Sequence, residues 1–174
     1  MKRQTCLTMA FVFGGLLMAQ AAVALELSTP AFKQGEKIPS KYTCDGTGVN
    51  PALNFSGVPA NAKQLVLTMH DPDVPKNLMP SGNFDHWMVW DIAPTNKGIA
   101  EGAGASMGIN GTGKAGYIGP CPPDREHRYF FRLYAVDIPL AGKTFKDRAA
   151  VEEAIKGHIL AQSELMGRYE KIKK

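Results

Sequence analysis

The stretch Arg128-Tyr-Phe-Phe-Arg-Leu-Tyr-Ala-Val-Asp137 decides the fold, because it is a long run of aromatic and apolar residues that Pro139 stops. Residues of these types favour β-strands. Two more strands are predicted on the same grounds, at 65–69 after a proline-containing turn and at 84–91 before Pro94. Weaker strands are expected near 26–27, 53–55, 99 and 116–118. The chain is therefore expected to consist mainly of strands.

One region has helical spacing instead. From Asp147 to about Met166 the apolar residues recur every three or four positions, at Val151, Ile155, Ile159, Leu165 and Met166. Thr144 with Asp147 predicts a capping pair at the start, and Gly167 predicts a stop. Many strands and one late helix predict a mainly β protein, a β-sandwich with one C-terminal helix.

Composition limits the classes of protein that the chain can belong to. Its 174 residues correspond to about one domain, and 44% hydrophobic with 21% charged residues is ordinary globular composition. This excludes disorder, collagen and a coiled coil as descriptions of the whole chain. The 18 glycines and 12 prolines indicate many turns. A net charge of +4 is too small for a dedicated nucleic-acid binder, so no nucleic-acid partner is expected.

The first residues have the layout of a secretory signal peptide. Lys2 and Arg3 precede an apolar stretch, and Ala22-Val23-Ala24 supplies the small residues that a signal peptidase needs. We expect a signal peptide at 1–24 and a mature domain at 25–174, periplasmic or secreted. The apolar stretch is short for a spanning helix, which needs ~20 residues, so stable membrane insertion is not expected. A retained anchor is the alternative.

Two cysteines follow the predicted cleavage site, Cys44 and Cys121. In an exported chain an even pair suggests a disulfide, and two buried free thiols are the alternative. Two isolated cysteines are too few ligands for a zinc site.

The glycine-rich segment 98–116 contains Gly111-Thr-Gly-Lys-Ala-Gly116, which matches a dinucleotide-binding pattern and overlaps a near match to a phosphate-binding loop. Both patterns need a helix to follow. Pro120, Pro122 and Pro123 follow instead, and prolines forbid a helix there. The segment is expected to be a surface loop, and no cofactor is predicted.

Four short motifs carry groups with acid–base or ligand chemistry. They are Asp71-Pro-Asp-Val-Pro75, Phe84-Asp-His-Trp87, Tyr117-Ile-Gly-Pro-Cys-Pro-Pro123 and His127-Arg-Tyr129. Each lies at the edge of a predicted strand or in a proline-stiffened loop, where functional sites are commonly built. Alternation along the strand places His127 and Tyr129 on one face and turns Arg128 away from it.

In this order, these motifs resemble the phosphatidylethanolamine-binding protein family, and most closely its bacterial, Raf-kinase-inhibitor-like branch. The resemblance runs from Phe32 to Tyr169 and includes Tyr42-Thr-Cys-Asp-Gly46 and Gly157-His-Ile-Leu-Ala161. It implies a two-sheet antiparallel β-sandwich with short peripheral helices. It also implies a small pocket for phosphate-like anions or phosphoryl head groups, and protein partners are compatible with the family.

Carried over residue by residue, the pocket would use Asp71, His86, Pro123, His127 and Tyr129, with Asp73 and Pro75 shaping its rim. Cys44 and Cys121 lie in motifs that flank the pocket, which supports their pairing. Some eukaryotic members have a second histidine where this chain has Asp85. A carboxylate near the mouth is expected to weaken anion binding.

Protonated His86 and His127 would supply positive charge for an anion, and Asp71 nearby is expected to raise the pKa of both rings. The favoured function is therefore an exported ligand-binding protein. The alternative is a hydrolase acting on a phosphate or acyl ester through the Asp/His pocket. The same Asp and His residues could also hold a metal ion, although no metal site is predicted.

Overall fold

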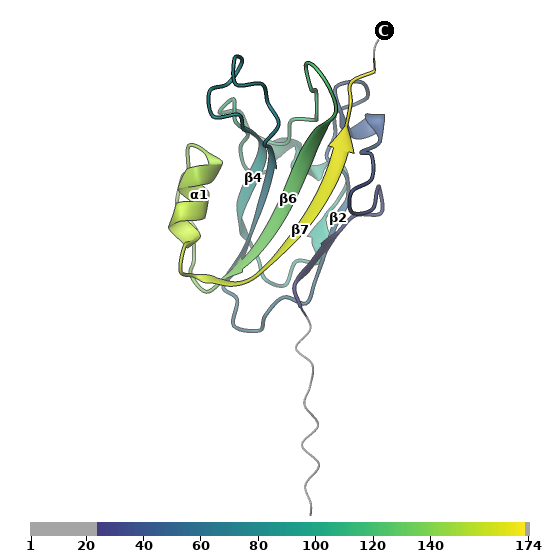
Figure 1. Ribbon diagram of the computed structural model, residues 1–174. Coiled ribbons are helices and arrows are strands. Elements are labelled where there is room, and N and C mark those ends of the chain that lie inside the picture. Colours follow the sequence, from purple (N-terminus) through teal and green to yellow (C-terminus); the bar gives the residue numbers. More distant parts are fainter. Residues whose placement is uncertain (1–23, 173–174) are drawn as a thin grey trace, which may run out of the picture.

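The computed structural model describes residues 24–172 and shows two antiparallel sheets packed face to face. One sheet has the order β1-β2-β5, with β1 at Glu26–Ser28, β2 at Leu53–Ser56 and β5 at Gly98–Ile99. The other has the order β4-β3-β6-β7, with β3 at Gln64–Asp71, β4 at Phe84–Ile92, β6 at His127–Val136 and β7 at Ile159–Tyr169. The predicted two-sheet antiparallel sandwich is confirmed (Figure 1).

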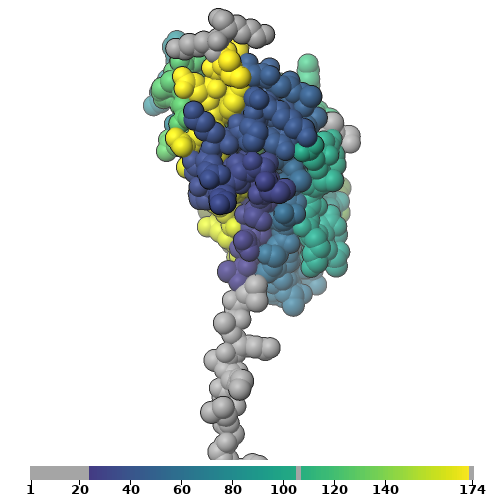
Figure 2. Space-filling model, turned by 90° about the vertical axis from the view of Figure 1, so that its right-hand side faces the viewer, coloured from purple at the N-terminus to yellow at the C-terminus, as the bar shows by residue number. Residues whose placement is uncertain are grey.

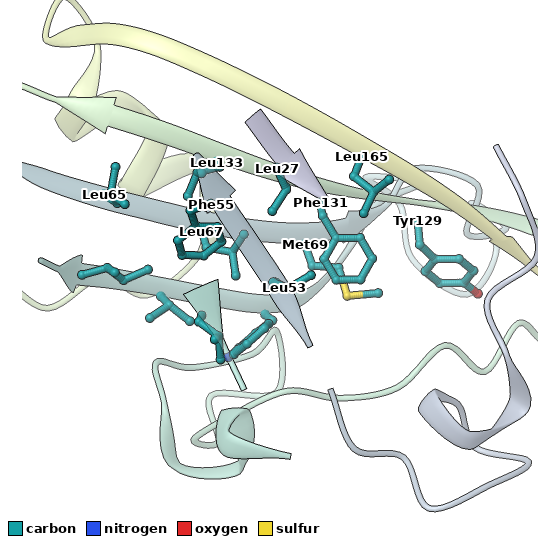
Figure 3. Close-up of a cluster of buried hydrophobic side chains, with 14 of the residues drawn as sticks. Leu27, Leu53, Phe55, Leu65, Leu67, Met69, Tyr129, Phe131, Leu133 and Leu165 are labelled. Atoms are coloured by element: carbon teal, nitrogen blue, oxygen red, sulfur yellow. The ribbon is translucent and has the colours of Figure 1, made fainter. Parts of the chain in front are cut away.

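The main core lies between the two sheets. Along β6 the side chains of Tyr129, Phe131 and Leu133 are fully buried on the inner face. They pack with residues of β3 and of the smaller sheet, among them Leu67, Met69, Leu27, Leu53 and Phe55 (Figure 3). Tyr129 lies at the end of this row, with its hydroxyl pointing away from the other labelled side chains. The alternation seen in the sequence thus produces the core.

The helix prediction is only partly correct. Helix α1 covers Arg148–Ile155, and β7 follows it from Ile159 to Tyr169, where helix was expected to continue to about Met166. Gly157 adopts a positive φ of 79°, which ends the helix. The following residues pair with β6 along almost its whole length, so sheet hydrogen bonds replace helical ones. The predicted cap also differs, because Asp147 itself caps the helix by accepting from the Ala150 N–H at 2.8 Å.

Gly167 is not a helix stop but a core position of β7. A Cβ placed there would lie 2.5 Å from Cγ1 of Ile38 and 2.8 Å from Cε2 of Phe32. Only glycine lets the segment that precedes Ser40 approach β7 so closely. Figure 2 shows this N-terminal segment, in purple and blue, packed beside the yellow C-terminal strand.

Short helical turns lie at the periphery, as expected: η1 at Ser40–Tyr42 and η2 at Ala103–Ser106. Helix α1 packs against the outer face of the four-stranded sheet, where Val151 and Ile155 contact Val66, Tyr134 and Val136. The weak strand expected at 116–118 is absent from the described strands, and that segment is a loop. Of the predicted signal peptide, only Ala24 falls within the described residues.

Candidate functional site

Three of the predicted site residues line one small cavity of about 240 Å³. They are Asp71 at the end of β3, His86 in β4 and Pro123 in the loop before β6. The other lining residues are Val74, Phe84, Ile118, Gly119 and Cys121. The cavity wall is therefore largely apolar, and its ionisable groups are one carboxylate and one imidazole. Its size suits a small head group rather than a drug-sized ligand.

Asp71 is held in place by two hydrogen bonds. Its Oδ1 accepts from the backbone N–H of Asp73 at 2.8 Å, which closes the turn at the end of β3. Its Oδ2 lies 2.7 Å from Nδ1 of His127, the first residue of β6. Because β3 and β6 are hydrogen-bonded neighbours, the end of one strand meets the start of the other. The sheet itself thus brings together two residues that are 56 positions apart.

His127 contacts Asp71 but is not itself among the residues that line the cavity. Its side chain is fully buried, and its Nε2 lies 2.8 Å from Oδ1 of Asp124. Both ring nitrogens of His127 therefore face carboxylates. Sequence reasoning missed Asp124; the three-residue spacing from His127, immediately before a strand, is the signal that could have identified it.

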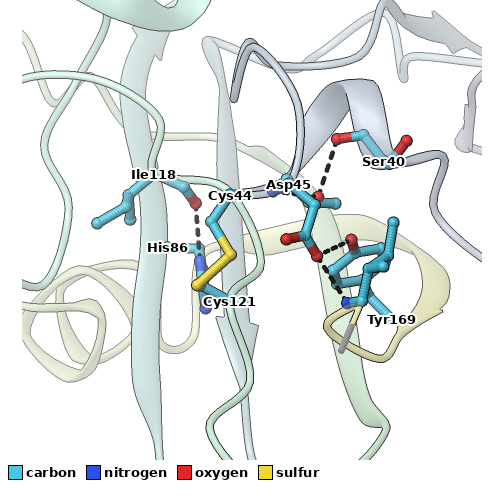
Figure 4. The surroundings of a disulfide bond; sticks show 9 residues. Ser40, Cys44, Asp45, His86, Ile118, Cys121 and Tyr169 are labelled. Carbon is cyan, nitrogen blue, oxygen red and sulfur yellow. Dashed lines mark hydrogen bonds between the residues drawn. A yellow bond between two sulfur atoms is a disulfide. The ribbon is translucent and has the colours of Figure 1, made fainter. Parts of the chain in front are cut away.

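His86 has a defined hydrogen-bonding state. Its Nδ1 lies 2.7 Å from the carbonyl oxygen of Ile118 (Figure 4). A carbonyl oxygen only accepts, so Nδ1 carries the hydrogen and donates it. In the neutral ring Nε2 is then an acceptor, and it is the ring nitrogen left for a ligand.

The pKa of His86 is lowered, which contradicts the expectation that it would be raised. Burial is the largest cause, because it disfavours the charged ring. The hydrogen bond to Ile118 and the charges of Asp71 and Asp85 act in the opposite direction, but burial prevails. The charge of Asp71 thus raises the pKa of His86, as the sequence suggested, but burial of the ring lowers the pKa by more.

Tyr129 lies next to His86 on the inner face of the sheet. The two rings meet edge to face with centroids 5.2 Å apart. The Tyr129 hydroxyl is buried and has no hydrogen-bond partner among the described residues. Burial, helped by the charge of Asp71, raises its pKa, so the hydroxyl keeps its hydrogen. It is a donor that a bound ligand or water could satisfy.

The two predicted rim residues have structural roles. Asp73 accepts hydrogen bonds from Nε and Nη2 of Arg128 at 2.8 and 2.7 Å, and Arg128 lowers its pKa to about 2. Pro75 does not line the cavity; its carbonyl accepts from the N–H groups of Leu78 and Met79, which closes the following turn. Val74 contacts the cavity in its place.

Asp85 does not act as the expected carboxylate at the mouth. Alternation along β4 turns it to the outer face of the sheet, opposite His70, while His86 faces the cavity. There it accepts from the backbone N–H and from Nε of Arg148, both at 3.0 Å. Its charge is therefore paired at the start of α1.

The predicted disulfide between Cys44 and Cys121 is present, with Cα atoms 5.4 Å apart. The N–H of Cys44 also donates to the carbonyl of Pro120 at 3.0 Å, so the two segments are joined twice. Cys121 is part of the cavity wall, next to His86 (Figure 4). The disulfide thus fixes the segment that carries Ile118 and Pro123.

Two kinds of feature are absent from residues 24–172, the part of the chain that the structure describes. No cluster of three or more His, Cys, Asp or Glu side chains there is arranged to hold a metal ion. No helix in that part of the chain is long and apolar enough to cross a membrane.

Comparisons with known proteins agree on one family. A UPF0098 protein of Chlamydia trachomatis is 46% identical over 149 residues, covering 84% of this chain and 99% of that protein. Another, from Methanothermobacter thermautotrophicus, is 40% identical and covers 83% of this chain and 98% of the relative.

Solved structures show the same fold. A phosphatidylethanolamine-binding protein homologue from Chlamydia trachomatis superposes with a TM-score of 0.81 at 45% identity, covering 86% of this chain and 99% of that one. YbcL of E. coli, described as a member of the mammalian family, gives 0.74 at 26% identity, with 85% and 99% covered. The sequence model of the phosphatidylethanolamine-binding protein family matches residues 28–170. The chain therefore belongs to the phosphatidylethanolamine-binding protein family.

Proposed function

We propose that this protein is an exported ligand-binding protein whose Asp71–His86 cavity takes up a phosphate-like anion or a phosphoryl head group together with a proton. The observation that carries the proposal is the contact between Nδ1 of His86 and the carbonyl of Ile118. It leaves Nε2 as the ring nitrogen whose protonation decides whether the cavity accepts or donates a hydrogen bond.

In the resting state the cavity presents acceptors. Nε2 of neutral His86 has a lone pair, and Asp71 is a carboxylate whose oxygens already accept hydrogen bonds. A fully ionised anion meets no donor from these two groups. When His86 takes up a proton, Nε2 becomes a donor and the ring gains a positive charge next to the anion. The Tyr129 hydroxyl offers a second donor near the ring.

The cavity lining also limits affinity and size. No lysine or arginine is among the described residues that line the cavity, so imidazolium is the cation that would neutralise the ligand. Arg128, the nearest arginine in the motifs, is paired with Asp73 instead. A volume of about 240 Å³ accommodates a phosphoryl group and its first substituent, with longer chains left outside. The name of the family is compatible with this class of ligand.

Export is part of the proposal and rests on the sequence of residues 1–24. A disulfide with exposed half-cystines agrees with it, because such bonds persist in oxidising compartments and are rare in the cytosol. The hydrolase alternative is not favoured. The described part of the cavity lining contains no serine, and its cysteine, Cys121, is bonded to Cys44.

A titration with inorganic phosphate tests the proposal. Affinity is measured by calorimetry at mildly acid and mildly alkaline pH for the wild type, His86→Gln and the control His158→Gln, whose histidine lies at the surface with Asp137. The wild type and the control should bind more tightly at acid pH, and His86→Gln should lose most of this dependence. Absence of phosphate binding to the wild type at both pH values would overturn the proposal.

A further inference from the structure

The imidazole of His127 lies between two carboxylates that differ in exposure. Its Nδ1 is 2.7 Å from Oδ2 of Asp71, whose side chain is 4% exposed, and its Nε2 is 2.8 Å from Oδ1 of Asp124, which is 44% exposed. The ring itself has no exposed surface. We call Asp71, His127 and Asp124 the triad. It leads from the cavity to the surface through a buried ring.

The two short contacts require two hydrogens. Ionised carboxylates only accept, and a neutral imidazole has a single N–H. With one hydrogen, the contact that lacks it would bring two acceptors together, either at the buried carboxylate of Asp71 or at the part-exposed carboxylate of Asp124, which is unfavourable in both cases. With two hydrogens both contacts are hydrogen bonds, and the triad has a net charge of −1 rather than −2.

The two carboxylates belong to different hollows of the surface. Asp71 lines the cavity of about 240 Å³, and Asp124 lines a larger hollow of about 660 Å³ that also contains Arg125 and Lys171. Cys121 and Pro123 line both hollows, whereas His127 lines neither. The buried ring is therefore the hydrogen-bonded connection between a wall of the cavity and a carboxylate in contact with solvent.

We infer that Asp124 keeps the second hydrogen on the triad, so that this hydrogen can neutralise Asp71 when an anion enters the cavity, which leaves the net charge of −1 on Asp124 at the surface. In this step the hydrogen on Nδ1 of His127 moves to Oδ2 of Asp71: an N–H bond breaks and an O–H bond forms. The Nε2–H continues to donate to Asp124, so both hydrogen bonds persist. This transfer needs no proton from solvent, whereas the protonation of His86 does. The inference rests on the proposed function and makes Asp124 a positioning residue.

The charged surroundings suit this transfer. The titratable or charged groups around the triad are His86 in β4, Tyr129 in β6, the Asp73–Arg128 pair, Arg125 beside Asp124, and Tyr169, which lies opposite His127 in β7. The hollow of Asp124 also contains Asp45, Glu170 and Lys171. The hydrogen bond from His127, together with Arg125, lowers the pKa of Asp124. Asp124 is thus the group of the triad suited to carry the negative charge.

The variant Asp124→Asn tests, without any ligand, whether Asp124 keeps a second hydrogen on the ring of His127. An amide can donate to Nε2, so the ring of the variant needs only one hydrogen of its own. The matched control is Asp137→Asn, because Asp137 is also 44% exposed and contacts Nδ1 of His158 at 2.9 Å. Ring ¹⁵N chemical shifts of His127 at neutral pH should show two protonated nitrogens in the wild type and the control, and one in Asp124→Asn. An unprotonated ring nitrogen in the wild type, or an unchanged spectrum in Asp124→Asn, would overturn the inference.

A sulfate titration tests the transfer step, since sulfate has no ionisation of its own between mildly acid and mildly alkaline pH. The Asp124→Asn variant has to take a proton from a buffer acid to neutralise Asp71. For each unit by which the pH rises, its affinity for sulfate should therefore fall about tenfold more than that of the wild type. Equal pH dependence in the two proteins contradicts the transfer. If neither protein binds sulfate, both the transfer and sulfate as a ligand of the proposed site are overturned. The ¹⁵N spectra are independent of this outcome, because they report only on the second hydrogen of the His127 ring.

Discussion

Nδ1 of His86 lies 2.7 Å from the carbonyl oxygen of Ile118, and this contact determines what the cavity offers a ligand. Because Nδ1 must donate, protonation of the ring can only add a hydrogen to Nε2. The loop that carries Ile118 is in turn fixed by the Cys44–Cys121 disulfide. The disulfide, which lies outside the sheets, thus supports the tautomer of His86, which lies in β4.

The disulfide should contribute strongly to stability. Cys121→Ser opens a loop of 77 residues and is expected to lower the free energy of unfolding by about 2–5 kcal/mol. Denaturant unfolding of the oxidised wild type and the variant measures this difference. Wild type reduced with a dithiol should match the variant, and a variant as stable as the oxidised wild type would contradict the prediction.

Gly167 should not tolerate a side chain. Gly167→Ala places a Cβ 2.5 Å from Ile38, so β7 or the facing segment must move, at a cost of about 1–3 kcal/mol. Gln162→Ala, an exposed position on the same strand, serves as the control and should change stability by less than about 0.5 kcal/mol. Thermal unfolding distinguishes them, and equal stability of the two variants would refute the close packing.

His70 should make the fold sensitive to acid. It is buried on the outer face of the sheet, and burial, with Arg148 and Arg132 nearby, lowers its pKa to about 3. An unfolded histidine titrates near ~6.5, so as pH falls the unfolded chain takes up the proton first. Stability is therefore lost progressively between these two values, by about 1–3 kcal/mol after allowance for solvent screening.

His70→Gln should remove this loss, while His158→Gln, at an exposed ion pair, should retain it. Urea unfolding at neutral pH, and again at a pH near the lower of the two pKa values of His70, measures the difference. An acid-induced loss of the same size in His70→Gln and the wild type would show that other groups are responsible.

The mature protein should begin at Leu25, because the Ala-x-Ala pattern places cleavage after Ala24. N-terminal sequencing of protein recovered from the exported fraction measures this directly. Recovery of the chain with Met1 intact would contradict both the cleavage and the proposed export.

The strands of the core were predictable because their side chains alternate or form continuous apolar runs, as in β6 and β3. The boundary between α1 and β7 was not, because Ile159 and Leu165 continue the helical spacing by chance. Only the pairing with β6 decides between helix and strand there. Local sequence has no information on such a distant partner.

The site was partly predictable for a similar reason. Asp71, His86 and Pro123 stood in motifs at strand edges, and the sheet brings those edges together. The lowered pKa of His86 depends on burial by Phe84, Ile118 and other wall residues, which no single motif specifies. Asp124 was missed because its role depends on which way a buried ring points.

The most direct test of the proposed function is the number of protons taken up when an anion binds. Sulfate binding is measured by calorimetry at neutral pH in two buffers with different heats of ionisation, for the wild type and for His86→Gln. The account predicts uptake of about one proton per sulfate by the wild type, as His86 becomes charged, and about one fewer by His86→Gln. Sulfate binding without proton uptake by the wild type would contradict it.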